Sequence, residues 1–185
     1  MIENQILKRR LSFSESSLLV ENIKKTPNII GYTVQEWMRS EHSFLALTGD
    51  TLIGACLNYD FHQRWRKVAA LIVIEEYRSN GAGKALFYES CNDAIAAGKS
   101  IYTVSANPIV IEMMNELGFQ TFPSIIALAR KYPIYGISIL LHSLRWLVSW
   151  YRIKETVRKA FQYSRDSGFT FGIKLVETDV DPCPK

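Results

Sequence analysis

The chain has 185 residues, a length that suits one domain over residues 1–185, and its 48% hydrophobic and 22% charged residues are typical of a globular protein. The net charge of +4 favours an anionic ligand but is too small to predict nucleic-acid binding. Cys56, Cys91 and Cys183 stand far apart without a CxxC pair, so we expect reduced thiols in a cytoplasmic protein and no metal site.

The first forty residues predict one strand followed by two helices. A short basic segment around Ile6 fits a strand. Residues 14–24 have apolar side chains at helical spacing, and the serines at the start of this stretch are candidate helix caps: Ser14, Ser16 and Ser17. Thr33 and Glu36 have the spacing of a capping box, which predicts a second short helix over residues 33–39.

The middle of the chain changes to strand-like patterns. Two runs, over residues 43–48 and 52–59, are joined by Gly49-Asp50, which is a hairpin signal. A third run covers residues 65–74. These three runs predict an antiparallel meander.

Helices and strands then alternate. We expect a helix that ends near Ala97, a strand over 100–105, a helix that begins at Asn107-Pro108, and a strand over 123–130. A long helical pattern over 134–164 and a last strand over 169–177 complete the chain. This order predicts a mixed α/β sheet with helices on its faces.

The most informative segment joins the apolar run Leu71–Ile74 to a helix through a turn that contains Gly81 and Gly83. Glycines let the backbone approach a ligand closely, and the free N–H groups at the start of a helix favour a phosphate. A P-loop would need Ser or Thr where the chain has Ala85, and a dinucleotide fingerprint would need Gly where it has Leu86. The segment therefore indicates another phosphate-bearing ligand.

The whole pattern, L-x-V-x-x-x-Y-R-x-x-G-x-G-x-x-L, resembles the acyl-CoA-binding signature of the GNAT acetyltransferase superfamily. The matching residues are Leu71, Val73, Tyr77, Arg78, Gly81, Gly83 and Leu86. A second segment, from Asn107 to Phe119, is similar to the Asn-helix-Gly-Phe segment of that family. The resemblance covers residues 44–122 closely. It implies a mixed, mostly antiparallel central sheet flanked by helices, here with a long extra helix between the last two strands.

The resemblance also implies a donor and a set of contacts for it. The donor would be acetyl-CoA, and the main chain of Leu71, Ile72 and Val73 would pair with its pantetheine arm. The N–H groups of the turn would hold the pyrophosphate: Arg78, Ser79, Asn80, Gly81, Ala82, Gly83 and Lys84. Asn107 would contact the pantetheine. The implied activity is N-acetyl transfer to a small-molecule or peptide amine, with a non-catalytic acyl-CoA-binding or sensing domain as the alternative.

The residues for proton transfer depart from the family pattern. Many members carry a Tyr where this chain has Met114, and some carry a Glu near the position of Lys67. Neither Met113 nor Met114 can donate a proton. As flexible apolar side chains, at least one of the two is expected to pack in the core. Tyr59 and His62 are the candidate substitutes, and an ordered water is a third route. Other polar residues expected near the acceptor are Glu36, Glu41, His42 and Asp60.

The helical pattern over 134–164 is the other unusual feature. His142 and Arg145 interrupt its apolar stripe, so we expect an amphipathic helix and no membrane-spanning one. Its basic residues are Arg145, Arg152, Lys154, Arg158, Lys159 and Arg165. The stripe has to be covered, and four coverings stay open: the sheet of the same domain, a homodimer interface, a wall of the acceptor site, or a lipid surface.

Overall fold

A seven-stranded sheet forms the centre of the molecule. The computed structural model describes residues 4–26, 29, 31–147, 150–162 and 168–176. The strand order is β1-β2-β3-β4-β5-β7-β6, and every neighbouring pair is antiparallel except β4 and β5. The strands are β1 (Gln5–Lys8), β2 (Phe44–Thr48), β3 (Thr51–Phe61), β4 (Trp65–Val73), β5 (Ser100–Ser105), β6 (Gln120–Phe122) and β7 (Thr170–Lys174). The predicted meander of β2, β3 and β4 is confirmed.

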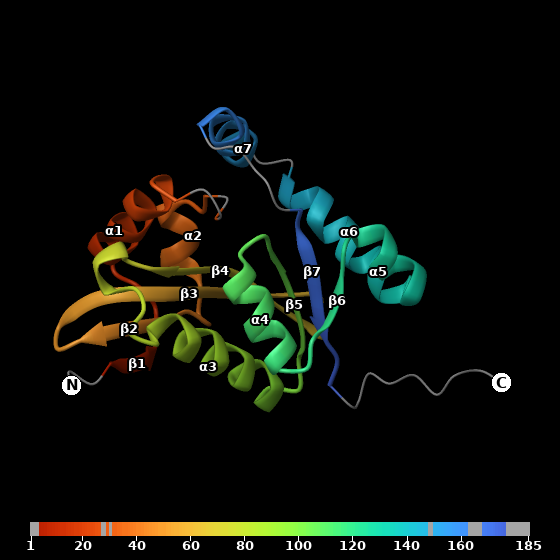
Figure 1. Cartoon of the computed structure of the whole chain (residues 1–185), viewed down its shortest axis with the longest axis horizontal. Helices are drawn as coiled ribbons and strands as arrows, with labels where there is room; N and C mark the ends of the chain where they lie inside the picture. Colours follow the sequence, from red (N-terminus) through yellow and green to blue (C-terminus); the bar gives the residue numbers. More distant parts are fainter. Residues whose placement is uncertain (1–3, 27–28, 30, 148–149, 163–167, 177–185) are drawn as a thin grey trace.

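Helices cover both faces of this sheet, as predicted (Figure 1). They are α1 (Phe13–Lys24), α2 (Val34–Arg39), α3 (Ala82–Ala96), α4 (Pro108–Glu116), α5 (Ile125–Lys131), α6 (Pro133–Leu147) and α7 (Trp150–Gln162). A short 3₁₀ turn, Glu75–Tyr77, leads from β4 toward α3. Cys183, Arg165 and the predicted ends of the last helix and strand lie outside the described residues.

The two helices near the N-terminus begin at capping boxes. In α2 the side chain of Thr33 accepts from the N–H of Glu36, as the sequence predicts. The predicted caps of α1 are wrong, because the capping residue is Ser12, whose side chain accepts from the N–H of Glu15. Glu15 returns the contact to the N–H of Ser12 at 2.8 Å, so the box closes two residues earlier than Ser14.

The strand predicted over residues 123–130 is also wrong. β6 ends at Phe122, and α5 begins at Ile125 with Ser124 as its cap, which accepts from the N–H of Ala127 at 3.1 Å. An apolar run this short fits a strand and a buried helix equally well, so periodicity alone does not separate them. The insertion between the last two strands therefore contains three helices, α5, α6 and α7. The single long helix predicted there is described as α6 and α7, on either side of residues 148–149.

The core lies on both sides of the sheet. α3 and α4 pack on one face through side chains that include Phe87, Met113 and Met114, so the predicted core position of the two methionines is confirmed. On the opposite face, α1 and α2 surround Trp37. α5 and α6 cover the neighbouring part of that face through a cluster that includes Ile139.

A buried arginine ties the sheet to α3. The Arg66 side chain on β4 is only 3% exposed, and its Nε donates to Asp60 Oδ1 at 2.6 Å. Its Nη1 donates to Asp93 Oδ2 of α3 at 2.5 Å. Burial by itself would raise the pKa of Asp60, but the hydrogen bond and charge of Arg66 outweigh it and lower that pKa. The guanidinium therefore forms ion pairs with two carboxylates at once.

We expect Arg66→Ala to destabilise the fold, because it leaves Asp60 and Asp93 without this counter-charge. The free energy of unfolding, measured with urea, should fall by about 3–5 kcal/mol. Lys8 also contacts Asp93, at 2.5 Å, but its side chain is 39% exposed. Lys8→Ala is thus the matched control and should cost less than about 1 kcal/mol. Equal losses in the two variants would contradict the assignment of Arg66 as the central cation.

Candidate functional site

The two parallel strands of the sheet separate halfway along β4. β4 pairs with β5 only over Trp65–Val68, whereas its pairing with β3 continues to Val73. At the last shared pair, Thr103 Oγ1 donates to the carbonyl of Val68 at 3.0 Å. Beyond this point, no strand among the described residues pairs with the β5 side of β4. The second half of β4 thus presents an open edge.

The backbone of β4 is irregular where the strands separate. Leu57 pairs with Ala70 and Asn58 with Val68, so Ala69 is an extra residue, as in a β-bulge. Farther along, the N–H of Ile74 donates to Ile53 of β3 at 2.8 Å. Because backbone groups alternate in direction along a strand, Ile72 also faces β3, and Leu71 and Val73 face the open edge. Of the three residues predicted to pair with pantetheine, two have their main-chain groups on this edge.

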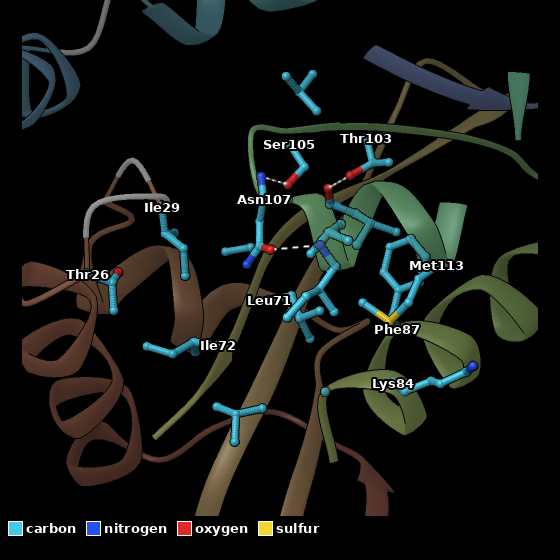
Figure 2. A pocket seen from close by; sticks show the side chains of 18 of the residues that line it. Thr26, Ile29, Leu71, Ile72, Lys84, Phe87, Thr103, Ser105, Asn107 and Met113 are labelled. Atoms are coloured by element: carbon cyan, nitrogen blue, oxygen red, sulfur yellow. Dashed lines mark hydrogen bonds between the residues drawn. The ribbon is translucent and has the colours of Figure 1, made fainter. Parts of the chain in front are cut away.

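A cavity of about 1010 Å³ runs along the open edge. Figure 2 shows Thr26 and Ile29, from the connection after α1, on one side of it, with Phe87 of α3 and Met113 of α4 on the other. All of the predicted cofactor residues line this cavity except Ala82, which is buried in the core. The structure therefore brings together two predicted groups of residues, the strand end and the glycine turn.

The N-terminus of α3 forms the wall at the far end of this edge. Gly81 is the N-cap residue, with φ +84°, a conformation that glycine adopts at little cost. Glycine has no side chain to cap the first turn, and of the turn's N–H groups that of Ala82 donates to Asn80 Oδ1 at 3.0 Å. The first turn of this 15-residue helix is thus a fitting site for an anion.

The two cations of the turn have partners in the protein. Arg78 Nε donates to the carbonyl of Val73 at 3.2 Å, so its side chain lies against the open edge. Lys84 Nζ lies 2.7 Å from Glu116 of α4, and this hydrogen bond raises the pKa of Lys84. Figure 2 shows Lys84 at the start of α3. The N–H groups of the helix and the Arg78 guanidinium are therefore positive features at this end of the edge.

Asn107 lies where β5 passes into α4. Its Oδ1 accepts from the N–H of Ile109 at 3.0 Å and caps the helix, and its own N–H donates to Ser105 Oγ at 3.0 Å (Figure 2). Pro108 follows in the first turn, where a missing N–H costs nothing. The side chain lines the cavity. Its contact with pantetheine stays a prediction.

A buried lysine lines the same cavity near the point where β4 and β5 separate. Lys67 is 7% exposed, and its Nζ lies 5.9 Å from the ring centre of Tyr59 and 5.7 Å from that of Tyr102. Burial, with a smaller contribution from the charge of Arg152, lowers the pKa of Lys67 to about 7. The sequence analysis noted this position only for its missing Glu. The signal that was missed is the position of this lysine two residues after Trp65, which places both side chains on the same face of the strand. An apolar strand should bury that face, and a lysine there is costly unless it has a role.

The candidates Tyr59 and His62 line a second cavity, of about 690 Å³, between α2, the end of β3 and α6. Tyr59 Oη lies 3.2 Å from His142 Nε2 of α6, and burial raises the pKa of Tyr59. His62 is exposed and has φ +56° in the turn after β3. Neither side chain lines the first cavity. Their catalytic roles stay predictions.

Three of the other polar candidates form ion pairs. Glu36 pairs with Arg152, Glu41 with Arg10, and Asp60 with Arg66. His42 Nε2 lies 3.7 Å from Asp60, in the cluster around Arg66. These side chains belong to ion-pair networks, and none of them lines the cavity along the open edge of β4.

The inserted helices form walls of both cavities. Ser143 of α6 lines the first one and lies 3.4 Å from Tyr102 Oη, and His142 stacks on Phe61 with ring centres 4.1 Å apart. From α7, Arg152 pairs with Glu36 of α2 and lies 5.4 Å from the ring centre of Tyr32. Four coverings of the insertion were predicted. The structure shows one of them, because the inner face of the insertion packs on the sheet of the same domain.

Solved structures with the same fold are numerous, and three of them illustrate the likeness. N-acetylglutamate synthase from Neisseria gonorrhoeae, complexed with coenzyme A and L-arginine, has a TM-score of 0.58 and 15% identity, over 96% of this chain and 34% of that one. Ard1 from Thermoplasma volcanium has a TM-score of 0.56 and 15% identity, over 94% of this chain and 97% of that one. YncA from Salmonella typhimurium, with its cofactor acetyl-CoA, has a TM-score of 0.53 and 13% identity, over 64% of this chain and 80% of that one. The chain thus spans about a third of the synthase and nearly all of Ard1.

At these identities the solved structures show the fold alone. No curated protein matches the sequence of this chain. A model of the acetyltransferase (GNAT) family, however, matches residues 12–119. This match spans more than half of the chain and includes β4, the glycine turn, α3 and α4. The chain therefore belongs to the acetyltransferase (GNAT) family.

Proposed function

We propose that this protein transfers the acetyl group of acetyl-CoA to an amine. The observation that carries the proposal is the open edge of β4, which leads along one cavity to the uncapped first turn of α3. An amide-containing arm fits such an edge, and a pyrophosphate fits such a helix start. Membership in the acetyltransferase family and the acetyl-CoA in the Salmonella typhimurium neighbour support the same donor.

The residues divide the task of holding the donor. Acetyl-CoA would supply an acetyl thioester, on whose carbonyl carbon a C–N bond forms as the C–S bond breaks. The departing CoA thiolate would take up the proton that the newly acylated nitrogen releases. Leu71 and Val73 would hydrogen-bond with the pantetheine amides through their main chain. The N–H groups of the first turn of α3 would hold the pyrophosphate, and Arg78 would add its charge.

Lys67 is the side chain that we propose as the base. An amine attacks only when it is neutral, so a proton has to leave the acceptor ammonium. A lysine whose pKa is about 7 is neutral in a large fraction of molecules at neutral pH, and its Nζ accepts that proton. Tyr59 keeps its own proton in this range because burial raises its pKa. His62 lines only the second cavity.

The acceptor is a small-molecule or peptide amine in this proposal. It would enter the first cavity from the end that Lys67, Tyr32 and Tyr102 line, opposite to the glycine turn. The alternative function, a non-catalytic acyl-CoA-binding or sensing domain, is favoured by the apolar Met114 at the position of the usual tyrosine. Acetyl-CoA consumption with a panel of amines, from neutral pH to about pH 10, where α-amino groups are neutral and a substantial fraction of alkyl amines is too, separates the two. Binding of acetyl-CoA without turnover across this pH range would contradict the proposed enzymatic activity.

The main-chain contact can be tested with Val73→Pro. Proline removes the N–H that faces the open edge and leaves the hydrogen bonds of the neighbouring residues with β3 in place. Loss of one hydrogen bond should weaken acetyl-CoA binding about three- to tenfold, measured by calorimetry. Val73→Ala shortens the side chain but keeps the N–H, so its affinity should stay near that of the natural protein. A loss in Val73→Ala as large as in Val73→Pro would contradict the edge contact.

The role of Lys67 can be tested by the pH dependence of kcat. Because the pKa of Lys67 is lowered to about 7, its neutral fraction and the rate should rise as pH increases through about 7. In Lys67→Met this limb of the pH profile, the rise of kcat near pH 7, should disappear. Its kcat should fall by about 10²–10⁴-fold, with acetyl-CoA affinity retained. Lys67→Arg keeps a cation that cannot deprotonate and should lose the limb as well. A limb near pH 7 that persists in both variants would exclude Lys67 as the base.

A further inference from the structure

The outer face of α6 is a continuous apolar surface. Its exposed side chains are Ile134, Ile137, Leu140, Leu141 and Leu144, with exposures between 38% and 69%. At about 100° per residue these positions fill about a third of the helix circumference. Ile126 of the adjacent α5 is 62% exposed and adds to the apolar side chains of this helix pair. We call the five α6 side chains the outer face.

The opposite side of α6 is firmly packed. Ile139 is fully buried, and Gly136 lies so close to α5 that an added Cβ would stand 2.3 Å from Ala129 Cα. α6 also contacts the sheet through His142 and Ser143. The helix therefore has a fixed orientation, and its outer face stays directed away from the core.

The net charge of the insertion is more positive than that of the whole chain. Residues 125–162 contain seven Lys and Arg and a single acidic residue, Glu155, for a net charge of +6, against +4 for all 185 residues. The rest of the chain is therefore at −2. Four of these cations are exposed: Arg130, Lys131, Arg145 and Lys154. Arg130 and Lys131 immediately precede α6 and Arg145 lies in its last turn, so cations stand at both ends of the outer face.

We propose that the outer face of α6 docks on the surface of an anionic lipid bilayer. An apolar helix face with lysines and arginines around it enters the headgroup region, where the cations meet anionic lipids. A second copy of the chain is the other candidate, but an isologous dimer through the outer face would bring the exposed cations at the ends of the two faces, Arg130, Lys131 and Arg145 of each copy, close together. The charge therefore favours the bilayer over the dimer.

The length of the helix agrees with docking in the plane of the interface. α6 has 15 residues and is about 22 Å long, shorter than a hydrocarbon core of ~30 Å. Among the described helices, none has the length and apolar character that a membrane span requires. Leu141 and Arg145 also line the second cavity, so docking would bring the mouth of that cavity near the lipid headgroups. The proposal does not depend on acetyl transfer.

Flotation of the full chain with lipid vesicles tests the proposal. We expect binding to phosphatidylcholine vesicles with about 30% phosphatidylserine at about 0.05 M salt, weaker binding at about 0.5 M salt, and little binding to pure phosphatidylcholine. No binding to the anionic vesicles at low salt would overturn the proposal. Equal binding to both kinds of vesicle would overturn the part played by the cations.

A pair of matched variants locates the contact. Ile137→Ser with Leu144→Ser removes two exposed apolar side chains from the outer face and should reduce vesicle binding at least about tenfold. Phe13→Ser changes an apolar side chain on α1 that is even more exposed, at 68%, and should bind as the natural protein does. Circular dichroism checks that both variants fold. Undiminished binding in the α6 variant, or a natural protein that is a dimer only until these α6 residues are changed, would overturn the proposal.

Discussion

The separation of β4 from β5 after Val68 is the constraint on which the rest of the site depends. Up to that point the main-chain groups of the two strands form hydrogen bonds with each other, and the Thr103 side chain donates a further hydrogen bond to the Val68 carbonyl. After it, the main chain of β4 has hydrogen-bonding groups along one side that need a partner other than β5. Such an edge is costly in an isolated domain. It is retained here inside a cavity, where a ligand with amide groups can satisfy it.

The part of the fold that came from strong local signals was predictable from the sequence. The hairpin at Gly49-Asp50, the capping box at Thr33 and the glycine turn each depend on short-range chemistry that one sequence displays. The errors have the same origin. Ser12 and Ser14 are both good caps, and only the return contact from Glu15 decides between them. Around Ile125 the pattern was too short to separate strand from helix.

The residues that line the proposed donor side could be selected from the sequence, and Lys67 on the other side could not. Residues that contact the proposed donor lie within a short stretch of chain, so a linear pattern contains them. Lys67, by contrast, acquires its environment from Tyr59, Tyr102 and Arg152, which are far apart in the sequence. The bulge at Ala69 decides which residues in the second half of β4 share a face with Lys67, and a single extra residue in a strand has no clear sequence signal.

The proposed use of main-chain groups on the donor side has a consequence for how the protein can change over time. Substitutions at Leu71 or Val73 alter side chains but leave the N–H and C=O groups in place, so this half of the site tolerates drift. That tolerance accords with a fold shared at 13–15% identity with its solved neighbours. The acceptor end of the first cavity is lined by side chains, which include Tyr32, Lys67, Tyr102 and Ser143 of α6, and the matched family segment ends before α6 begins. If the proposed function holds, the acceptor preference can change through side chains at this end, Ser143 of α6 among them, without altering the β4 edge proposed to bind the donor.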